Sequence, residues 1–250
     1  MQNDQDAFGA ALVDCLNGNE THYIVERDDS FADPGSLTQY FTDFPGWSAI
    51  EKRMPEFVHG RVLDVGCGAG RHSLHLQSLG HEVVAIDRSP LAIEVSKRRG
   101  VKNAFVLSVD ELADDEAKLA ELGTFDSIIM MGHNIGLLHG WDEGRKILSG
   151  LHRITTPGAR IVGTTRNTKL TTSPEHLEYQ AENVLKGRMP GQIRFRIRHR
   201  RLIGSWLDYL FVSKEELSRL VDGTGWRLEA AVDGDGGFGG ESYLAVLCKE

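Results

Sequence analysis

The chain has little of several features that mark whole classes of protein. Its three cysteines, Cys15, Cys67 and Cys248, are widely spaced in 250 residues, which excludes a disulfide framework and a cysteine-based zinc site. No stretch approaches the roughly 20 apolar residues that a membrane-spanning helix needs. The first residues are polar and acidic, unlike the basic start and apolar core of a signal peptide. These absences favour a protein of the reducing cytoplasm with no membrane partner.

The chain also lacks an excess of positive charge. Its formal net charge is −8, whereas sequence-independent binding to nucleic acid needs a basic surface that neutralises phosphates. We therefore expect no nucleic-acid partner. Ten histidines are present, and His72 and His75 are three residues apart on a predicted helix. Since there is no HExxH pattern and no third ligand nearby, we expect no metal site.

What the sequence does contain is a glycine-rich turn after an apolar strand. Residues 60–71 read GRVLDVGCGAGR, and Asp87 follows a second apolar run, 83–86. Glycines let the backbone approach a ligand closely, and a carboxylate at a second strand end can accept both hydroxyls of a ribose. A dinucleotide fingerprint, G-x-G-x-x-G, would need a third glycine where this chain has Arg71. The pattern predicts a nucleotide site of another kind.

Apolar strands and helices alternate along the middle of the chain. The strands are expected near 61–66, 82–87, 103–108, 125–131 and 159–164. The helices are expected near 70–79, 90–98, 111–122 and 141–153. This alternation predicts right-handed βαβ units and a parallel sheet, whose ligands lie at the carboxyl ends of the strands.

The flanking segments do not follow this rhythm. Residues 1–58 are predicted as an N-terminal arm, with a short helix near 7–13, an irregular stretch, and a helix over 47–57. Residues 165–212 exceed the usual connection of about 2–6 residues and predict an inserted cap. That cap is expected to hold a helix near 177–185 and a hairpin over 192–212 that turns near Gly204.

The end of the chain returns to regular elements. A capping box, Ser213 to Glu216, predicts the start of a helix that ends near Gly223. Strands near 226–232 and 242–248, joined by the glycine-rich segment 233–240, predict a closing antiparallel hairpin. We expect one domain over 1–250.

The order Asp64-x-Gly66-x-Gly68-x-Gly70, followed by Asp87, resembles motif I of the class I S-adenosylmethionine-dependent methyltransferases. The resemblance covers about 60–165 and the closing strands. It implies an α/β Rossmann-like fold whose seven-stranded, mostly parallel sheet has the order 3-2-1-4-5-7-6, with the last strand antiparallel and helices on both faces. It further implies S-adenosyl-L-methionine as cofactor and methyl transfer to a small molecule by in-line displacement. Two alternatives remain: a methyltransferase of protein or nucleic acid, and a non-catalytic cofactor-binding module.

The resemblance also implies which residues meet the cofactor, at four strand ends. They are Asp64, Gly66, Cys67, Gly68, Gly70, Asp87, Arg88, Ser108, Val109, Met131 and His133. Aligning Leu112 with the family's usual leucine puts Ser108 beside the adenine, whereas aligning by acid alone picks Asp110; we favour Ser108 with Val109. Asp87 either binds the ribose or caps the next helix. Asp64 either fixes the loop, or reaches the cofactor's amine through water, or is a plain strand-end residue.

The loop after the fourth strand bears on the acceptor. It reads Gly-His-Asn-Ile-Gly-Leu over 132–137 and lacks the acid- or asparagine-Pro-Pro-aromatic tetrad of many N-methylating nucleic-acid and protein enzymes, which favours a small-molecule acceptor. His133 is the candidate general base, because imidazole titrates near neutral pH. The alternative, which we favour, is that His133 and Asn134 hold the loop or touch the methionine half of the cofactor.

Four arginines alternate with other residues in the predicted insertion: Arg194, Arg196, Arg198 and Arg200. A period of two puts all four on one face of a strand. They either line a pocket for a substrate carboxylate or phosphate, or form a solvated face that balances the acidic chain, and we favour the second. The sequence specifies neither the acceptor nor the oligomeric state.

Overall fold

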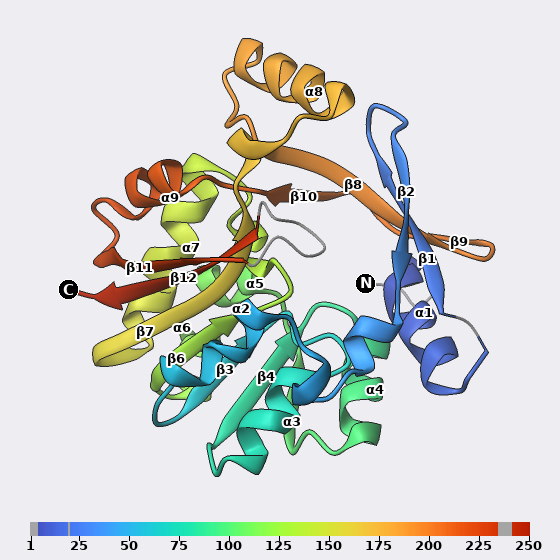
Figure 1. The fold of residues 1–250 in the computed structure, drawn as a ribbon. Coiled ribbons are helices and arrows are strands. Elements are labelled where there is room, and N and C mark those ends of the chain that lie inside the picture. The colour runs from blue at the N-terminus through green and yellow to red at the C-terminus, as the bar shows by residue number, and fades with distance from the viewer. Residues whose placement is uncertain (1–4, 20, 235–241) are drawn as a thin grey trace. The chain divides into compact units, whose positions relative to one another are not determined.

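A computed structural model describes residues 5–19, 21–234 and 242–250, and its strands form two sheets (Figure 1). The larger sheet contains β3 (Val62–Val65), β4 (Val83–Asp87), β5 (Asn103–Val106), β6 (Phe125–Met130), β7 (Thr155–Arg166), β11 (Trp226–Asp233) and β12 (Ser242–Lys249). Its order is β11-β12-β7-β6-β3-β4-β5. The smaller sheet contains β1 (His22–Arg27), β2 (Ala32–Ser36), β8 (Gln192–His199), β9 (Leu202–Ile203) and β10 (Leu207–Leu210). Its order is β10-β8-β1-β2, with β9 paired to β8.

The predicted Rossmann-like α/β class is confirmed by the larger sheet. β4 pairs with β5, and β6 with β7, in parallel. The closing strand β12 is antiparallel both to β7 and to β11. Every residue of β3 and β4 is buried, as expected of parallel strands with both faces covered.

The chain divides into two compact units, each described here by itself. The first comprises Met1–Trp47, Asp64–Ser108 and Arg194–Leu207. The second comprises Ser48–Leu63, Val109–Ile193 and Asp208–Glu250. The division falls inside β3, so the glycine loop that follows this strand belongs to the first unit.

The first unit contains α1 (Ala7–Leu16), α3 (Arg71–Ser78), α4 (Pro90–Arg99) and two 3₁₀ turns, η2 (Thr38–Phe41) and η3 (Phe44–Gly46). Buried side chains of α1, including Leu12, share a core with Tyr23 of β1 and Val95 of α4. The predicted irregular arm is wrong, because β1 and β2 form an antiparallel hairpin. β2 reads Ala-Asp-Pro-Gly-Ser, and such residues are rare in strands except at a sheet edge, where β2 lies.

The predicted turn at Gly204 is also wrong. β8 turns into β9 at Arg200 and Arg201, since His199 pairs with Leu202. Gly204 instead donates its N–H to the Ile197 carbonyl, at 2.8 Å. Arg200 has a φ of 53°, a conformation that usually marks glycine or asparagine. Arg200-Arg201 thus carries no turn signal of the usual residue types.

The second unit contains the remaining helices. They are α2 (Ala49–Lys52), η4 (Met54–Glu56), α5 (Val109–Asp114), α6 (Glu116–Leu122), η5 (Asn134–Leu138), α7 (Trp141–Arg153), η6 (Thr168–Leu170), α8 (Pro174–Leu185) and α9 (Lys214–Val221). In Figure 1, α7 and α9 lie beside β7, β12 and β11.

Two predicted helices of the second unit are interrupted. The helix expected over 47–57 breaks between α2 and η4, where Pro55 lacks the N–H that a continuous helix would use. The helix expected over 111–122 divides at Asp115, which caps α6. The capping box at Ser213 is confirmed, with Glu216 closing it.

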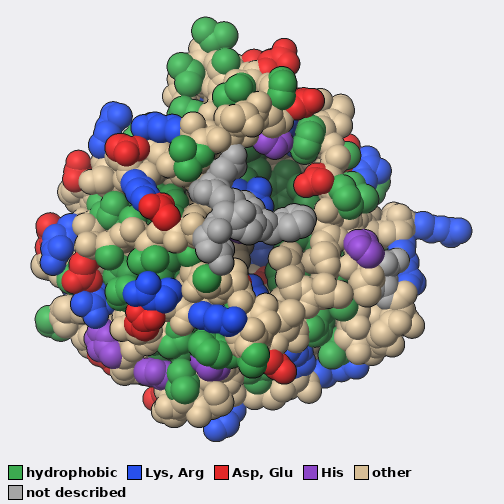
Figure 2. All heavy atoms as spheres, viewed as in Figure 1, with side chains coloured by type: hydrophobic (Ala, Val, Ile, Leu, Met, Phe, Trp, Pro, Cys, Tyr) green, Lys and Arg blue, Asp and Glu red, His purple; other side chains and the backbone are tan. Residues whose placement is uncertain are grey.

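The insertion after β7 exposes an apolar helix face. Leu177, Val184 and Leu185 of α8 are exposed, and Figure 2 shows hydrophobic side chains over this helix. Among the described residues, no helix is both long and apolar enough to cross a membrane. Of the predicted glycine-rich connection 233–240, only Asp233 and Gly234 lie within the described residues.

Candidate functional site

The loop after β3 depends on three glycines. Gly66, Gly68 and Gly70 have φ values of 75°, 54° and 77°. Residues with a Cβ atom rarely adopt this left-handed conformation, whereas glycine adopts it without strain. The N–H groups of Gly66 and Cys67 both donate to the carbonyl of Ile86 in β4, at 2.8 and 3.1 Å. The loop is thus fixed to the end of the neighbouring strand before α3 begins.

The glycines differ in what surrounds them. A Cβ on Gly70 would lie 2.6 Å from Cγ2 of Val101, so this glycine packs inside the protein. A Cβ on Gly68 would meet only Cδ1 of Tyr40, at 3.8 Å, which is ordinary contact. The protein itself leaves room beside Gly68. Among the described residues, therefore, no atom blocks a close approach to the Gly68 backbone.

Asp87 lies directly beside this loop and is 8% exposed. Its Oδ2 accepts the Gly68 N–H and its Oδ1 accepts the Ser89 N–H, each at 2.9 Å. A carboxylate oxygen has a further lone pair, so both oxygens keep the capacity to accept a ligand hydroxyl. Burial raises the pKa of Asp87, and the two N–H donors oppose that rise. The alternative that Asp87 caps α4 is wrong, because Ser89 accepts the Ala92 N–H and is the N-cap.

A second buried carboxylate, which the sequence reading missed, continues this network. Asp6 is 1% exposed and accepts the Ser89 hydroxyl at 2.7 Å and the Leu91 N–H at 3.1 Å. Its other oxygen accepts the Gly9 N–H at 3.0 Å and so caps α1. Only an acid just before a helical segment marked Asp6 in the sequence. A hydrogen-bond chain therefore runs from the start of α1 through Ser89 to Asp87 and Gly68.

Asp64 is buried at the end of β3 and is held by α3. The Ser73 hydroxyl donates to its Oδ2 at 2.6 Å, a contact that ties the strand to the helix after the glycine loop. Burial raises the pKa of Asp64 to about 7, and the charge of Asp87 adds to the rise while Ser73 opposes it. This bond is what the loop-fixing interpretation requires, and the role of Asp64 toward the cofactor stays a prediction.

This raised pKa predicts a pH-dependent stability. Between the ordinary carboxyl pKa of 3.8 and about 7, folded Asp64 holds a proton that the unfolded chain has lost, so stability falls as pH rises. In Asp64→Asn this falling limb should be absent, and above pH 7 the variant should be more stable by up to about 4 kcal/mol. Thermal unfolding of both proteins from pH 4 to 8 measures the difference. Parallel curves would contradict the assignment.

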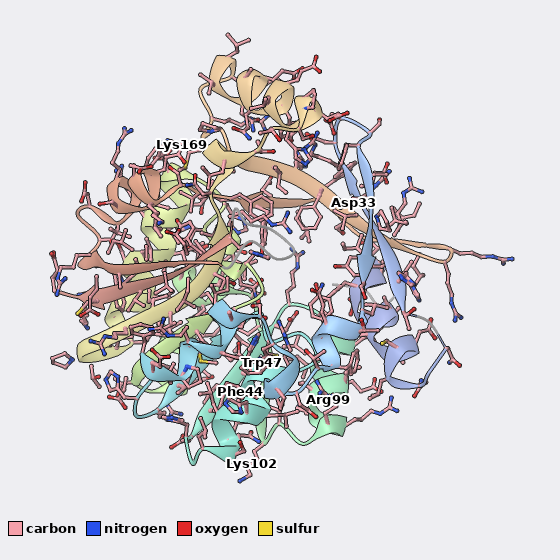
Figure 3. The ribbon with its side chains drawn as sticks, in the orientation of Figure 1. Asp33, Phe44, Trp47, Arg99, Lys102 and Lys169 are labelled. Carbon is pink, nitrogen blue, oxygen red and sulfur yellow. The ribbon has the colours of Figure 1, made fainter. Side chains whose placement is uncertain are left out.

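Aromatic residues from the N-terminal segment cover α3. The rings of Phe44 and His75 are stacked at 4.3 Å, and Trp47 lies edge-on to His72 at 4.6 Å. Phe44 and Trp47 are labelled beside α3 in Figure 3. The guanidinium of Arg71, the first residue of α3, lies 5.5 Å from the Trp47 ring. Both imidazoles are used in ring packing, and we find no cluster suited to a metal ion among the described residues.

The other predicted cofactor residues divide between the units. Arg88 is exposed and Ser108 is half-buried in the first unit, whereas Val109 and Met131 are buried in the second. Asp110, the alternative to Ser108, forms an ion pair with Nε2 of His139 at 2.9 Å. The choice between Ser108 and Asp110 on the adenine side stays a prediction.

In the second unit, His133 is held by its backbone and by its ring. Its N–H donates to Oγ1 of Thr164 at 2.8 Å, and its carbonyl accepts the Tyr209 hydroxyl at 2.8 Å. Its Nε2 lies 3.1 Å from Oγ of Ser242. Its φ of 69° is that of a left-handed residue. Oδ1 of Asn134 accepts from the same Tyr209 hydroxyl, at 3.2 Å, and whether His133 serves as a base or holds the loop stays a prediction.

The arginines of β8 are used within the smaller sheet. Arg196 and Arg198 both bind Glu26 of β1, and these bonds lower the pKa of Glu26 to about 2. Arg200 lies in the turn and pairs with Asp14 at 3.2 Å. The prediction that all four arginines share one strand face is therefore wrong for Arg200, and the charge-balancing interpretation fits Arg196 and Arg198.

The chain resembles known proteins most clearly over its central part. Residues 62–158 match the model of a methyltransferase domain family. A ubiquinone biosynthesis O-methyltransferase from Xanthomonas oryzae pv. oryzae is 31% identical over 117 residues, 45% of this chain and 45% of that protein. A 2-heptyl-1-hydroxyquinolin-4(1H)-one methyltransferase from Mycobacteroides abscessus is 30% identical over 141 residues, 51% of this chain and 59% of that protein. The match thus spans about half the length of these curated relatives.

One solved structure is similar over the whole chain. It is an S-adenosylmethionine-dependent methyltransferase from Bacteroides fragilis, in complex with S-adenosyl-L-homocysteine. The two chains superpose with a TM-score of 0.81 at 26% identity, and the match covers 100% of this chain and 97% of the other.

Proposed function

Since the chain belongs to the class I S-adenosylmethionine-dependent methyltransferases, we propose that it transfers the methyl group of S-adenosyl-L-methionine to a small-molecule acceptor. The observation that carries the proposal is the pairing of Gly68 with Asp87: open space on one side of a left-handed glycine, and beside it a carboxylate with capacity for two more hydrogen bonds.

The residues of the first unit fit the cofactor. Asp87 would accept the ribose hydroxyls, in charge-assisted hydrogen bonds. The N-terminus of α3, which has no side-chain cap, would face the carboxylate of the methionine half. Asp64 would fix the loop through Ser73, and Gly66, Cys67, Gly68 and Gly70 would line it. Ser108 and Arg88 would lie on the adenine side.

The chemistry divides between cofactor and protein. The cofactor supplies a sulfonium, which is already a good leaving group. The protein supplies alignment of the acceptor with the methyl and exclusion of water. In the second unit, Val109 and Met131 are the apolar candidates, and His133 would hold the loop after β6 through its bonds to Thr164, Ser242 and Tyr209.

A small acceptor is supported by the loop sequence and by the relatives. The segment 132–137 lacks the proline-containing tetrad of many enzymes that methylate nucleic acid or protein. The relatives named above are described as methyltransferases of ubiquinone biosynthesis and of a hydroxyquinolinone. A cytoplasmic location, inferred from the few cysteines, agrees with a metabolic role.

Two measurements test the proposal. Titration calorimetry should show binding of both S-adenosylmethionine and S-adenosylhomocysteine. Incubation with radiolabelled methyl donor and a metabolite extract should label a small molecule. Absence of cofactor binding would overturn the whole proposal, whereas label on protein or nucleic acid would overturn the acceptor class.

A further inference from the structure

Arg166 ends β7 on the face that carries the His133 contacts. Side chains two residues apart share one face of a strand, and Thr164, two residues earlier, accepts the His133 N–H. Arg166 lies opposite Ser242 in the antiparallel pair of β7 and β12, and Ser242 meets the His133 ring. Arg166 is therefore placed with His133, Thr164 and Ser242 at the carboxyl end of β7.

Phe211 completes this group. The Arg166 guanidinium lies 5.5 Å from the centre of the Phe211 ring. The His133 ring stands edge-on to the same ring at 6.2 Å, and Tyr209 does so at 5.6 Å. One cation, one imidazole and two aromatic rings thus lie together in the second unit.

Within the part of the chain that the structure describes, the Arg166 guanidinium forms no ion pair. Its Nε is buried and has no hydrogen-bond partner among the described residues, although buried polar groups are almost always paired. Contact with a ring compensates for only a part of that loss. Other cations of neighbouring elements already have partners: Lys214 binds Asp233, Arg160 binds Glu229 and Lys169 binds Glu215.

We propose that Arg166 binds a carboxylate of the methyl acceptor, so that the acceptor is a small organic acid. A guanidinium matches the two oxygens of a carboxylate. Lys214, Lys169 and Arg160 are already paired, whereas Arg188 of the insertion also has a buried Nε without a partner among the described residues. The test below therefore separates a carboxylate from a phosphate. The proposal rests on the proposed methyl transfer, and it leaves open which atom of the acid receives the methyl group.

The test begins with the charge of the acceptor. A metabolite extract is separated by anion exchange at neutral pH, and each fraction is incubated with the protein and radiolabelled methyl donor. The acceptor should be in the retained fraction and should survive phosphatase treatment. An acceptor in the flow-through, or one destroyed by phosphatase, would overturn the proposal.

Variants then test Arg166 itself. For the acceptor so found, Arg166→Gln should raise KM by roughly 10- to 100-fold, the usual range for a lost hydrogen bond to a charged group. The KM of Arg166→Lys should lie between that of Arg166→Gln and that of the wild type. Arg160→Gln, on the same strand but with its arginine paired to Glu229, is the matched control and should leave KM unchanged.

The melting temperature and the S-adenosylhomocysteine affinity of Arg166→Gln distinguish acceptor binding from a purely structural role. Removing an unpaired, partly buried cation should leave the melting temperature of Arg166→Gln equal to or above that of wild type, with S-adenosylhomocysteine affinity unchanged. A lower melting temperature together with weaker S-adenosylhomocysteine binding, or an unchanged acceptor KM, would overturn the assignment. If S-adenosylhomocysteine binds and no fraction is methylated, the proposed function itself fails.

Discussion

Replacing Asp87 with asparagine should weaken S-adenosylhomocysteine binding by roughly 100-fold, as measured by titration calorimetry. Asp87 accepts the Gly68 and Ser89 N–H groups, and the proposed ribose hydroxyls would be further donors. An asparagine side chain carries no charge, and its NH₂ group would face N–H or O–H donors where Asp87 has an accepting oxygen. Loss of two charge-assisted hydrogen bonds, at the lower figure of about 1.5 kcal/mol each, corresponds to about 3 kcal/mol, which is roughly 100-fold in affinity.

The pH dependence of the same affinity provides a second measurement. Burial raises the pKa of Asp87, and only the ionised carboxylate can accept from both hydroxyls. Wild-type affinity should therefore fall as pH is lowered through this raised pKa, and the fall should be absent in Asp87→Asn. Asp29→Asn, which removes a carboxylate paired with Arg27 in the same unit, serves as control. Equal affinity of Asp87→Asn and wild type would exclude the ribose role.

Alanine at Gly68 and at Gly70 should have different effects. At Gly68 the added methyl meets no crowded protein atom, so the fold should lose only the roughly 1–2 kcal/mol of a left-handed alanine. The methyl would, however, enter the space assigned to the cofactor, and S-adenosylhomocysteine binding should weaken by 100-fold or more. At Gly70 the methyl would press on Val101, and the variant should lose about 2–4 kcal/mol of stability.

Denaturant unfolding and calorimetry on the two variants separate these effects. A stable Gly68→Ala that binds S-adenosylhomocysteine as tightly as wild type would show that no ligand approaches this glycine. Equal destabilisation of both variants would show that Gly68, like Gly70, serves packing alone.

The sequence predicted those parts of the fold whose signals are local. Apolar strands separated by amphipathic helices specified β3 to β7, and the capping box at Ser213 specified the start of α9. Residues 64–70 and Asp87 were found together because their spacing along the chain is the spacing that a βαβ unit brings together. Ser89 as the N-cap of α4 also has a local signal, since serine before proline is a common helix start.

The parts that the sequence did not specify depend on partners far along the chain. β2 is a strand only because β1 pairs with it, and nothing in Ala-Asp-Pro-Gly-Ser indicates that pairing. Asp6 reaches Ser89 across 83 positions. Among the described residues, Nε of Arg166 has no hydrogen-bond partner, which only coordinates reveal. Arg196 and Arg198 pair with Glu26 of β1, a strand in a segment that the sequence predicted to be irregular.

The packing of α1 against α4 connects the N-terminal helix to the candidate ligand site. A Cβ on Gly9 would lie 2.3 Å from the Ser89 hydroxyl, so the helix is held against the residue that also binds Asp87. A helix of ten residues is too short to persist in water unaided. Its opening would break the Asp6–Ser89 bond, so free energy contributed by a ligand at Asp87 also opposes that opening. Amide hydrogen exchange in α1 should therefore slow when a ligand occupies the site beside Asp87, and loss of Asp6 should weaken ligand binding although Asp6 bonds to Ser89 and not to the ligand.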